Sequence, residues 1–229
     1  MVNDRKNIKS LRYASKGLAL RWLTLVAFVC ICLLGHAQST QTPNRQKDAE
    51  LLGKALEYFA SQKYHECLLI LQGLDLHYRL NPRYKAYLGV CYYYAWDYEN
   101  AIKHLSYAIP KLVHFAPHER SFYYWAIAES YFNLQNYDQA IPCYQDMLKL
   151  CYDKERAEAC YRLGFCYLFR EEWANAWSYF YAAQMGFQQY RPNDEQARIV
   201  QIGNMLKALN EKVVTEALAH IGINKTERK

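Results

Sequence analysis

Two histidines in this chain have a spacing that could hold a metal ion. His114 and His118 are four residues apart, which would place both imidazoles on one face of a helix. Pro117 lies between them, where it favours a turn over the interior of a helix. The chain has no C-x-x-C pair, and the interval of six residues between Cys160 and Cys166 points them to different faces of a helix. We therefore expect no metal site.

Pairs of carboxylates are the other candidates for chemistry, because two such groups can act as general acid and general base. Glu119 with Glu129, and Asp97 with Glu99, are pairs of this kind. Nothing around them predicts a dry or concave site, so solvated helix faces are the preferred interpretation. The sequence also contains no glycine-rich phosphate loop, no H-E-x-x-H and no G-x-S-x-G. We expect no catalytic residue, no cofactor and no small-molecule substrate.

Residues 1 to 37 have the three zones of a secretory signal peptide. Six basic side chains and one aspartate are followed by an uncharged apolar run of 13 residues, from Trp22 to Leu34. This run is too short to span a membrane comfortably, since a helix needs about 20 residues. A glycine, a histidine and an alanine then end the leader, with small residues where a signal peptidase requires them. We expect export and cleavage before Gln38; the alternative is an uncleaved membrane anchor.

Removal of the leader changes the charge balance. The chain has 28 basic and 22 acidic residues, and the part after the leader has 22 and 21. A nearly neutral chain without a basic run has no electrostatic footprint for nucleic acid or for a membrane surface. We therefore expect no nucleic-acid partner, and membrane contact only through an uncleaved leader.

A set of aromatic and small residues recurs four times after the leader. Each set has a tyrosine, a second aromatic residue six positions later and a small residue three positions after that. The first tyrosines of successive sets are 34, 39 and 36 residues apart, which predicts helical hairpins that bury their apolar faces against their neighbours. The sets are Tyr58, Tyr64 and Cys67; Tyr92, Tyr98 and Ala101; Tyr131, Tyr137 and Ala140; and Tyr167, Trp173 and Ala176.

Further positions repeat with the same register. A small residue precedes each first tyrosine by three positions, where a neighbouring helix must approach closely: Ala55, Gly89, Ala128 and Gly164. The second helix of each repeat has an apolar position four residues after its small residue, and another three residues later, which is a helical period. These positions hold Leu71, Leu105, Tyr144 and Phe180, and then Leu74, Ala108, Met147 and Ala183.

The pattern resembles the tetratricopeptide repeat (TPR) family. The matches that carry the resemblance are Leu88-Gly89-x-x-Tyr92 with Tyr98 and Ala101, and Leu163-Gly164-x-x-Tyr167 with Trp173 and Ala176. The resemblance implies an all-α, right-handed superhelical solenoid of about four helix-turn-helix repeats over residues 48–192. The prolines that close the family's repeats are displaced here, so the turns between repeats should be longer than usual.

The segments outside the repeats can be assigned from the same reasoning. Residues 38–47 should be a flexible segment, and an apolar stripe through residues 193–218 predicts a C-terminal capping helix that covers the last repeat. Residues 219–229 should be a disordered tail. Within the third repeat, Pro142 should bend its helix or delay the start of that helix.

Six cysteines follow the leader, and an exported chain would carry them in an oxidising compartment. Fifteen pairings are then conceivable. Cys67, Cys91 and Cys166 occupy repeat positions that suit small buried residues, so most cysteines should be core residues. If any pair is bridged, we favour Cys151 with Cys160, across a turn between repeats.

The family resemblance also implies a binding surface. In the family, certain positions of the first helices line a concave face, and here many of them are aromatic. Arg83 is the sole cation among them, so the basic clamp with which some relatives hold a carboxylate is missing. The predicted groove residues are Arg83, Tyr93, Tyr94, Phe122, Trp125, Glu129, Phe132, Tyr161, Phe165 and Phe169, with Ala86, Val90, Asn133, Glu158 and Leu168 at the remaining positions.

Exposed aromatic surface of this kind favours recognition of a protein or peptide. The alternative is that these rings pack internally or that the chain's own ends fill the groove. We therefore expect a non-catalytic adaptor of the bacterial envelope, most simply periplasmic. A structural subunit of an envelope or secretion assembly is the second hypothesis, and an enzyme with an unrecognised site is the third.

Overall fold

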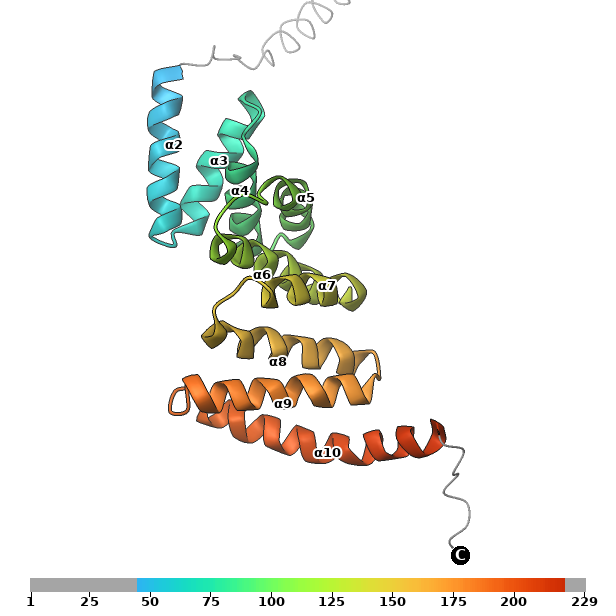
Figure 1. The fold of residues 1–229 in the computed structure, drawn as a ribbon. Helices are drawn as coiled ribbons and strands as arrows, with labels where there is room; N and C mark the ends of the chain where they lie inside the picture. Colours follow the sequence, from blue (N-terminus) through green and yellow to red (C-terminus); the bar gives the residue numbers. More distant parts are fainter. Residues whose placement is uncertain (1–44, 221–229) are drawn as a thin grey trace, which may run out of the picture. The chain divides into compact units, whose positions relative to one another are not determined.

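The computed structural model describes residues 45–220, so the predicted leader, residues 38–44 and residues 221–229 lie outside the described range. This range is helical and contains no β-strand. The helices follow one another as successive layers, each in contact with the next (Figure 1). They are α2 (Arg45–Ala60), α3 (Tyr64–His77), α4 (Pro82–Tyr94), α5 (Tyr98–Ala108), the short 3-10 helix η1 (Ile109–Lys111), α6 (Pro117–Asn133), α7 (Tyr137–Leu148), α8 (Asp153–Phe169), α9 (Trp173–Tyr190) and α10 (Gln196–His220).

The expected all-α repeat fold is confirmed. Helices α2 to α9 form four consecutive pairs, and α10 packs on α9 as the capping helix. The small and apolar positions that define the repeat are buried in every pair. Those with no solvent exposure include Ala55, Cys67, Leu71, Ala101, Leu105, Ala128, Ala140, Tyr144, Ala176 and Phe180.

The turn inside each pair has the same backbone geometry. A residue four positions after the first tyrosine has a positive φ near 60°, and the next residue donates its backbone N–H to the carbonyl of that tyrosine. These N–H to O distances lie between 2.8 and 3.0 Å. Left-handed backbone normally favours glycine, yet none of the four residues is one. They are Gln62, Trp96, Gln135 and Glu171.

Two of the second helices begin with side-chain caps. The carboxylate of Asp97 accepts the N–H of Asn100 at 3.2 Å, and the side chain of Asn136 accepts the N–H of Gln139 at 3.3 Å. Each cap satisfies a backbone donor that the helix leaves without a partner. In these two pairs the polar residue after the turn therefore helps to set where the second helix starts.

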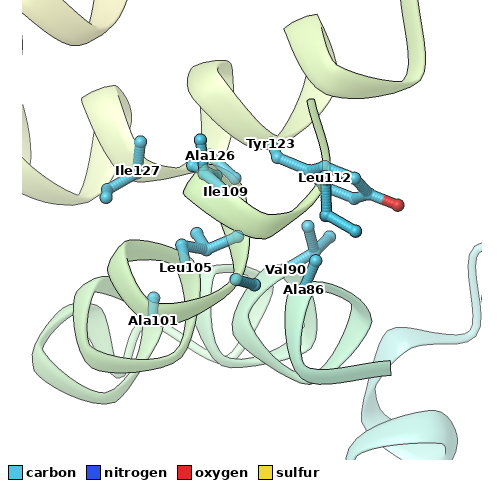
Figure 2. Packing of buried hydrophobic residues seen from close by; sticks show 10 residues of the cluster. Ala86, Val90, Ala101, Leu105, Ile109, Leu112, Tyr123, Ala126 and Ile127 are labelled. Atoms are coloured by element: carbon cyan, nitrogen blue, oxygen red, sulfur yellow. The ribbon is translucent and has the colours of Figure 1, made fainter. Parts of the chain in front are cut away.

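The hydrophobic core runs across repeat boundaries. Four buried clusters are present in residues 45–220, and each combines one helix pair with the first helix of the next layer. Figure 2 shows the second of them along the chain, in which Val90 of α4, Leu105 of α5 and Tyr123 of α6 converge with Ile109 of η1. Each pair thus buries its apolar surface together with its neighbour, as expected for a repeat array.

Close helix packing explains two of the glycines. A Cβ on Gly164 would lie 2.6 Å from the ring of Phe180, and one on Gly89 would lie 2.7 Å from the side chain of Leu105. A side chain at either position would push α8 from α9 or α4 from α5. By contrast, a Cβ on Gly53 of α2 would meet nothing within 4 Å.

Some expected boundaries differ from the observed ones. The first helix begins at Arg45, three residues before the expected start of the repeats, and the capping helix begins at Gln196 and ends at His220. The expected delay at Pro142 is wrong, because α7 begins at Tyr137 and continues through the proline. Pro142 lies early in the helix, and the carbonyl that loses its partner belongs to Asp138, an exposed residue of the first turn.

The six described cysteines are all free thiols. Cys151 and Cys160 are not bridged, and Cys67, Cys91 and Cys166 are fully buried in the core, as expected for small core residues. None of the helices between residues 45 and 220 combines the length and the hydropathy of a membrane span.

Candidate functional site

The ten predicted groove residues all lie on the first helices of the second, third and fourth pairs. Arg83, Tyr93 and Tyr94 are on α4; Phe122, Trp125, Glu129 and Phe132 are on α6; Tyr161, Phe165 and Phe169 are on α8. Their exposure varies widely. Phe169 is 52% exposed and Tyr94 is 44% exposed, whereas Glu129 is buried and the other rings are half-buried.

Part of the aromatic surface packs on itself, as the alternative hypothesis expected. Phe169 at the end of α8 stacks on Tyr137 at a ring distance of 5.1 Å and lies 5.9 Å from Phe165. On the preceding layers, Tyr94 stacks on Tyr64 at 3.9 Å. These rings form ladders that tie one repeat to the next and still keep one face exposed to solvent.

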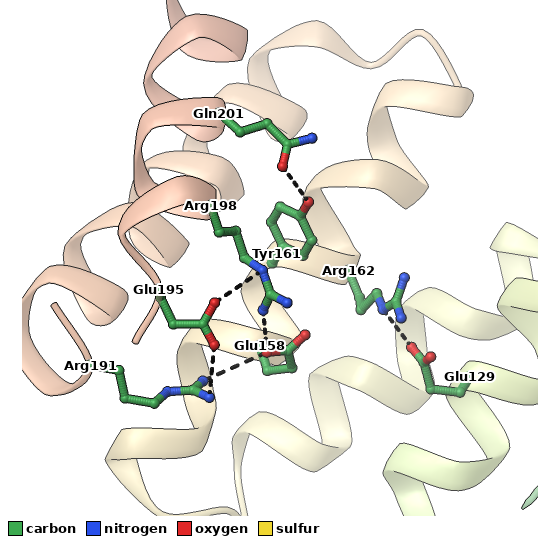
Figure 3. A network of polar contacts seen from close by, with 8 residues as sticks. All are labelled: Glu129, Glu158, Tyr161, Arg162, Arg191, Glu195, Arg198 and Gln201. Carbon is green, nitrogen blue, oxygen red and sulfur yellow. Dashed lines mark hydrogen bonds and ion pairs between the residues drawn. The ribbon is translucent and has the colours of Figure 1, made fainter. Parts of the chain in front are cut away.

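Polar contacts link α4 to α6, α6 to α8, and α8 to the capping helix α10. Arg83 of α4 forms a bidentate pair with Glu119 of α6, at 2.8 and 2.9 Å. Arg162 of α8 contacts Glu129 of α6 at 2.9 Å, and Arg198 of α10 contacts Glu158 of α8 at 2.7 Å (Figure 3). All of these contacts join residues 33 to 40 positions apart in the sequence. The layer of first helices is therefore held in register by charge pairs.

Glu129 is a buried charge at the centre of this layer. Its side chain is 3% exposed, and besides Arg162 it accepts a hydrogen bond from the hydroxyl of Tyr144. Burial raises the pKa of the Glu129 carboxyl above its ordinary value, while Arg162 and the bond from Tyr144 act in the opposite direction. Both polar partners of the Glu129 carboxylate, Arg162 and Tyr144, are side chains of this protein. We therefore interpret the contact between Glu129 and Arg162 as a structural ion pair.

A second polar cluster joins the fourth pair to the capping helix. Arg191 contacts Glu158 at 3.6 Å and Glu195 at 3.3 Å, and Arg198 contacts the same two carboxylates at 2.7 and 3.3 Å (Figure 3). The hydroxyl of Tyr161 adds a hydrogen bond of 3.4 Å to Gln201. The positive charges of two arginines and the negative charges of two glutamates thus balance one another at the start of α10.

A cavity of about 780 Å³ opens beside these contacts, between the N-terminal halves of α6 and α8. Phe122 and Trp125 line it, together with Glu158 from the wider predicted set. The other predicted groove residues do not line it. Its remaining lining residues are His118, Glu119, Ser121, Met147, Lys154, Glu155, Tyr190 and Arg191.

Sequence reasoning missed these remaining residues for an identifiable reason. Lys154 and Glu155 precede the repeat positions carried over from the family, Tyr190 is the last residue of the second helix of the last pair, and Arg191 follows that helix. The family positions give no signal for Lys154 or Glu155, while the displaced Pro117 and Pro192 mark the chain next to His118 and Arg191.

The histidine pair considered as a metal site does not come together on one helix. His114 lies in the turn before α6, whereas His118 is in the first turn of α6 and contacts Glu155 at 3.0 Å, with its ring stacked on Tyr152 at 4.2 Å. In the described part of the chain, no group of three or more histidine, cysteine or acidic side chains could hold a metal ion. His118 is instead part of the cavity wall.

Comparison with known proteins yields structural likeness without sequence likeness. No protein-family model matches this sequence, and no curated protein sequence matches it significantly. A structure of a MamA point mutant aligns with a TM-score of 0.57 and 16% identity, covering 79% of this chain and 97% of its own. MamA from Desulfovibrio magneticus RS-1 aligns with a TM-score of 0.53 and 14% identity, covering 80% and 98%.

The apo form of RapI gives a similar result, with a TM-score of 0.57 and 12% identity over 76% of this chain and 67% of its own. At such low identity these likenesses concern the fold alone. Together with the repeated helix pairs, they establish that this chain has a TPR-type, all-α solenoid fold.

Proposed function

We propose that this protein is a non-catalytic adaptor of the bacterial envelope that binds an extended, partly apolar polypeptide segment on the face formed by its first helices. One observation carries the proposal: the cavity of about 780 Å³ between α6 and α8, which Phe122 and Trp125 line. Concave sites of this size with apolar walls and a few polar groups are where proteins usually bind ligands.

A polypeptide suits this surface better than a small substrate does. The first helices that carry the cavity also carry exposed rings outside it, and Tyr94 on the preceding first helix α4 and Phe169 on α8 are 44% and 52% exposed. Rigid aromatic side chains contribute strongly to protein interfaces because they offer a large contact area at little entropic cost. The charges that support the layer are already paired within the chain, which argues for a structural role over an acid–base one.

The location in the envelope rests on the leader sequence. Residues 1 to 37 combine a basic first zone, a short apolar run and small residues at the expected cleavage site. We propose a periplasmic protein, with anchoring by an uncleaved leader as the alternative. Detection of Gln38 as the N-terminus of the protein purified from its native host would support cleavage, and an N-terminus at Met1 would contradict it.

A structural subunit of an envelope assembly is a second candidate, because apolar side chains are also exposed away from the first helices. Leu76 and Leu69 of α3 are 83% and 58% exposed, and Met185 of α9 is 48% exposed. A permanent subunit would cover such residues in its complex. Co-purification of one partner in fixed stoichiometry through high salt would favour this candidate.

The adaptor proposal can be tested with a double variant, Trp125→Ala with Phe169→Ala, in quantitative affinity capture from the native envelope. The matched control is Trp177→Ala with Tyr181→Ala, which removes a stacked pair at 5.3 Å on α9 that does not line the cavity. We expect the first variant to lose partners that the control retains. If both variants capture the same partners as the wild type, the adaptor proposal is wrong.

A further inference from the structure

The charged side chains that line the cavity differ in whether they already have a partner within the chain. Three carboxylates line it, and each already binds a basic side chain of the chain itself. Glu119 binds Arg83 in a bidentate pair, Glu155 contacts His118 at 3.0 Å, and Glu158 contacts Arg198 at 2.7 Å. A cationic ligand would have to displace one of these partners.

All but one of the basic side chains that line the cavity form ion pairs with carboxylates of the chain. His118 is paired with Glu155, and Arg191 is held by both Glu158 and Glu195 with its guanidinium 5.1 Å from the ring of Phe187. Lys154 is exposed in the first turn of α8. Among the described residues that line the cavity, it is the only charged side chain for which neither a hydrogen bond nor an ion pair is present.

Four large apolar or aromatic side chains also line the cavity. Phe122 and Trp125 come from α6, Met147 comes from α7, and Tyr190 ends α9. A large apolar side chain can therefore enter the cavity while a group next to it reaches the ammonium at the rim. A carboxylate is the group that gains there, because it pairs with Lys154 without breaking any existing contact.

We propose that the cavity binds a polypeptide segment in which an internal acidic residue lies beside a large apolar residue, with the apolar side chain between Phe122 and Trp125 and the carboxylate paired with Lys154. This inference rests on the proposed adaptor function and specifies the chemistry of its partner. It assigns a role to Lys154, which lies outside the positions that the family resemblance identified.

The test begins with a displayed library of random 12-residue peptides, selected against residues 38–229 of this protein. We expect the selected peptides to carry Asp or Glu within two residues of Phe, Trp, Leu or Met. One selected peptide is then synthesised with capped ends in two forms, one with the acid and one with the matching amide. Fluorescence anisotropy of both forms is measured with the wild type, with Lys154→Gln and with Trp125→Ala.

The expected result is a coupling between the peptide's acid and Lys154. Replacing the acid by the amide should weaken binding to the wild type by about two- to fivefold, as for an exposed ion pair, and Lys154→Gln should weaken the acidic form by the same factor. The amide form should bind Lys154→Gln and the wild type equally. Lys103→Gln is the matched control, because Lys103 is an exposed cation on α5 that does not line the cavity.

Other outcomes overturn the inference in distinguishable ways. If binding depends on Trp125 but the peptides lack an acid, or the acid shows no coupling to Lys154, the adaptor function stands and the acidic chemistry is wrong. Binding only through a free C-terminal carboxylate also overturns the inference. If no peptide is selected, or none is sensitive to Trp125→Ala, both the adaptor function and the inference fail.

Discussion

The buried pair between Glu129 and Arg162 gives the sharpest test of how the layer of first helices is stabilised. Replacing Arg162 by Met keeps an unbranched side chain over the ring of Phe132 but removes the charge. Glu129, which is 3% exposed, then has Tyr144 as its remaining partner. A buried carboxylate without its counter-charge is strongly unfavourable.

The size of the effect follows from the exposure of the two partners. Breaking a fully buried ion pair costs about 3–5 kcal/mol. Arg162 is 31% exposed, so water can partly replace it, and we expect Arg162→Met to lower the free energy of unfolding by about 2–3 kcal/mol at pH 7.5.

The cost should depend on pH in a direction that the pKa of Glu129 determines. Burial holds this pKa above its ordinary value in the folded protein, so ionised Glu129 opposes folding. Loss of Arg162 raises the folded pKa further, because Arg162 favours the ionised form. Below the unfolded pKa of about 4.3 the carboxyl is neutral in both states and the penalty disappears. The cost of the variant should therefore be small near pH 4 and grow as the pH rises, up to the variant's folded pKa.

Urea unfolding at pH 4 and at pH 7.5, followed by circular dichroism, measures this difference. Arg170→Met is the matched control, since Arg170 pairs with Asp138 and Glu172 at the surface and should cost less than about 1 kcal/mol. The double variant Glu129→Gln with Arg162→Met should recover most of the loss at pH 7.5. A cost no larger than that of the control, or one that does not change between the two pH values, would refute the reasoning.

Three further predictions concern packing, turns and thiols. Gly164→Ala should destabilise the fold by about 1–3 kcal/mol, because the added methyl group overpacks the contact with Phe180. Gly53→Ala should stabilise the fold by about 0.5–1 kcal/mol, because the space around Gly53 is open, and thermal unfolding of both variants measures the difference. Gln135→Gly should raise the free energy of unfolding by about 0.5–1 kcal/mol because it relieves a φ of 58°, while Leu134→Gly, at a φ of −81°, should lower it in the same urea titration. Burial raises the pKa of both Cys151 and Cys160, that of Cys160 to about 11, but Cys151 is only half-buried and should react faster with an aromatic disulfide reagent; labelling of Cys160 at an equal or faster rate would contradict this.

The repeat fold could be predicted because its signal is local and redundant. A small residue is required wherever two helix axes approach closely, and the same requirement recurs in every pair, as at Ala55 and Gly164. Tertiary packing can override the sequence preference at one such position, but it does not override the same preference repeated at equivalent positions of four helix pairs. This is why the burial of Leu71 and Phe180, which are more than one hundred residues apart, follows from the sequence alone.

The turns and helix starts were less predictable. Glycine is the usual sign of left-handed backbone, and the residues that adopt it here, such as Trp96 and Gln135, carry no such sign. Packing of the helices on either side fixes the turn and outweighs the local preference. The same reasoning applies to Pro142, where tertiary packing and the cap of Asn136 keep a helix that proline alone would disfavour.

By itself, the sequence determined the number and order of the helix pairs and the residues that form their shared core. Only the tertiary structure decided which charged side chains form ion pairs, such as Arg83 with Glu119 and Arg162 with Glu129. It therefore also decided that Lys154 lines a cavity without an ion-pair partner. The physical reason is that burial of apolar groups follows a helical period that can be read along one chain. Pairing of long charged side chains depends instead on distances between residues some 35 positions apart, which exist only after the helices have stacked.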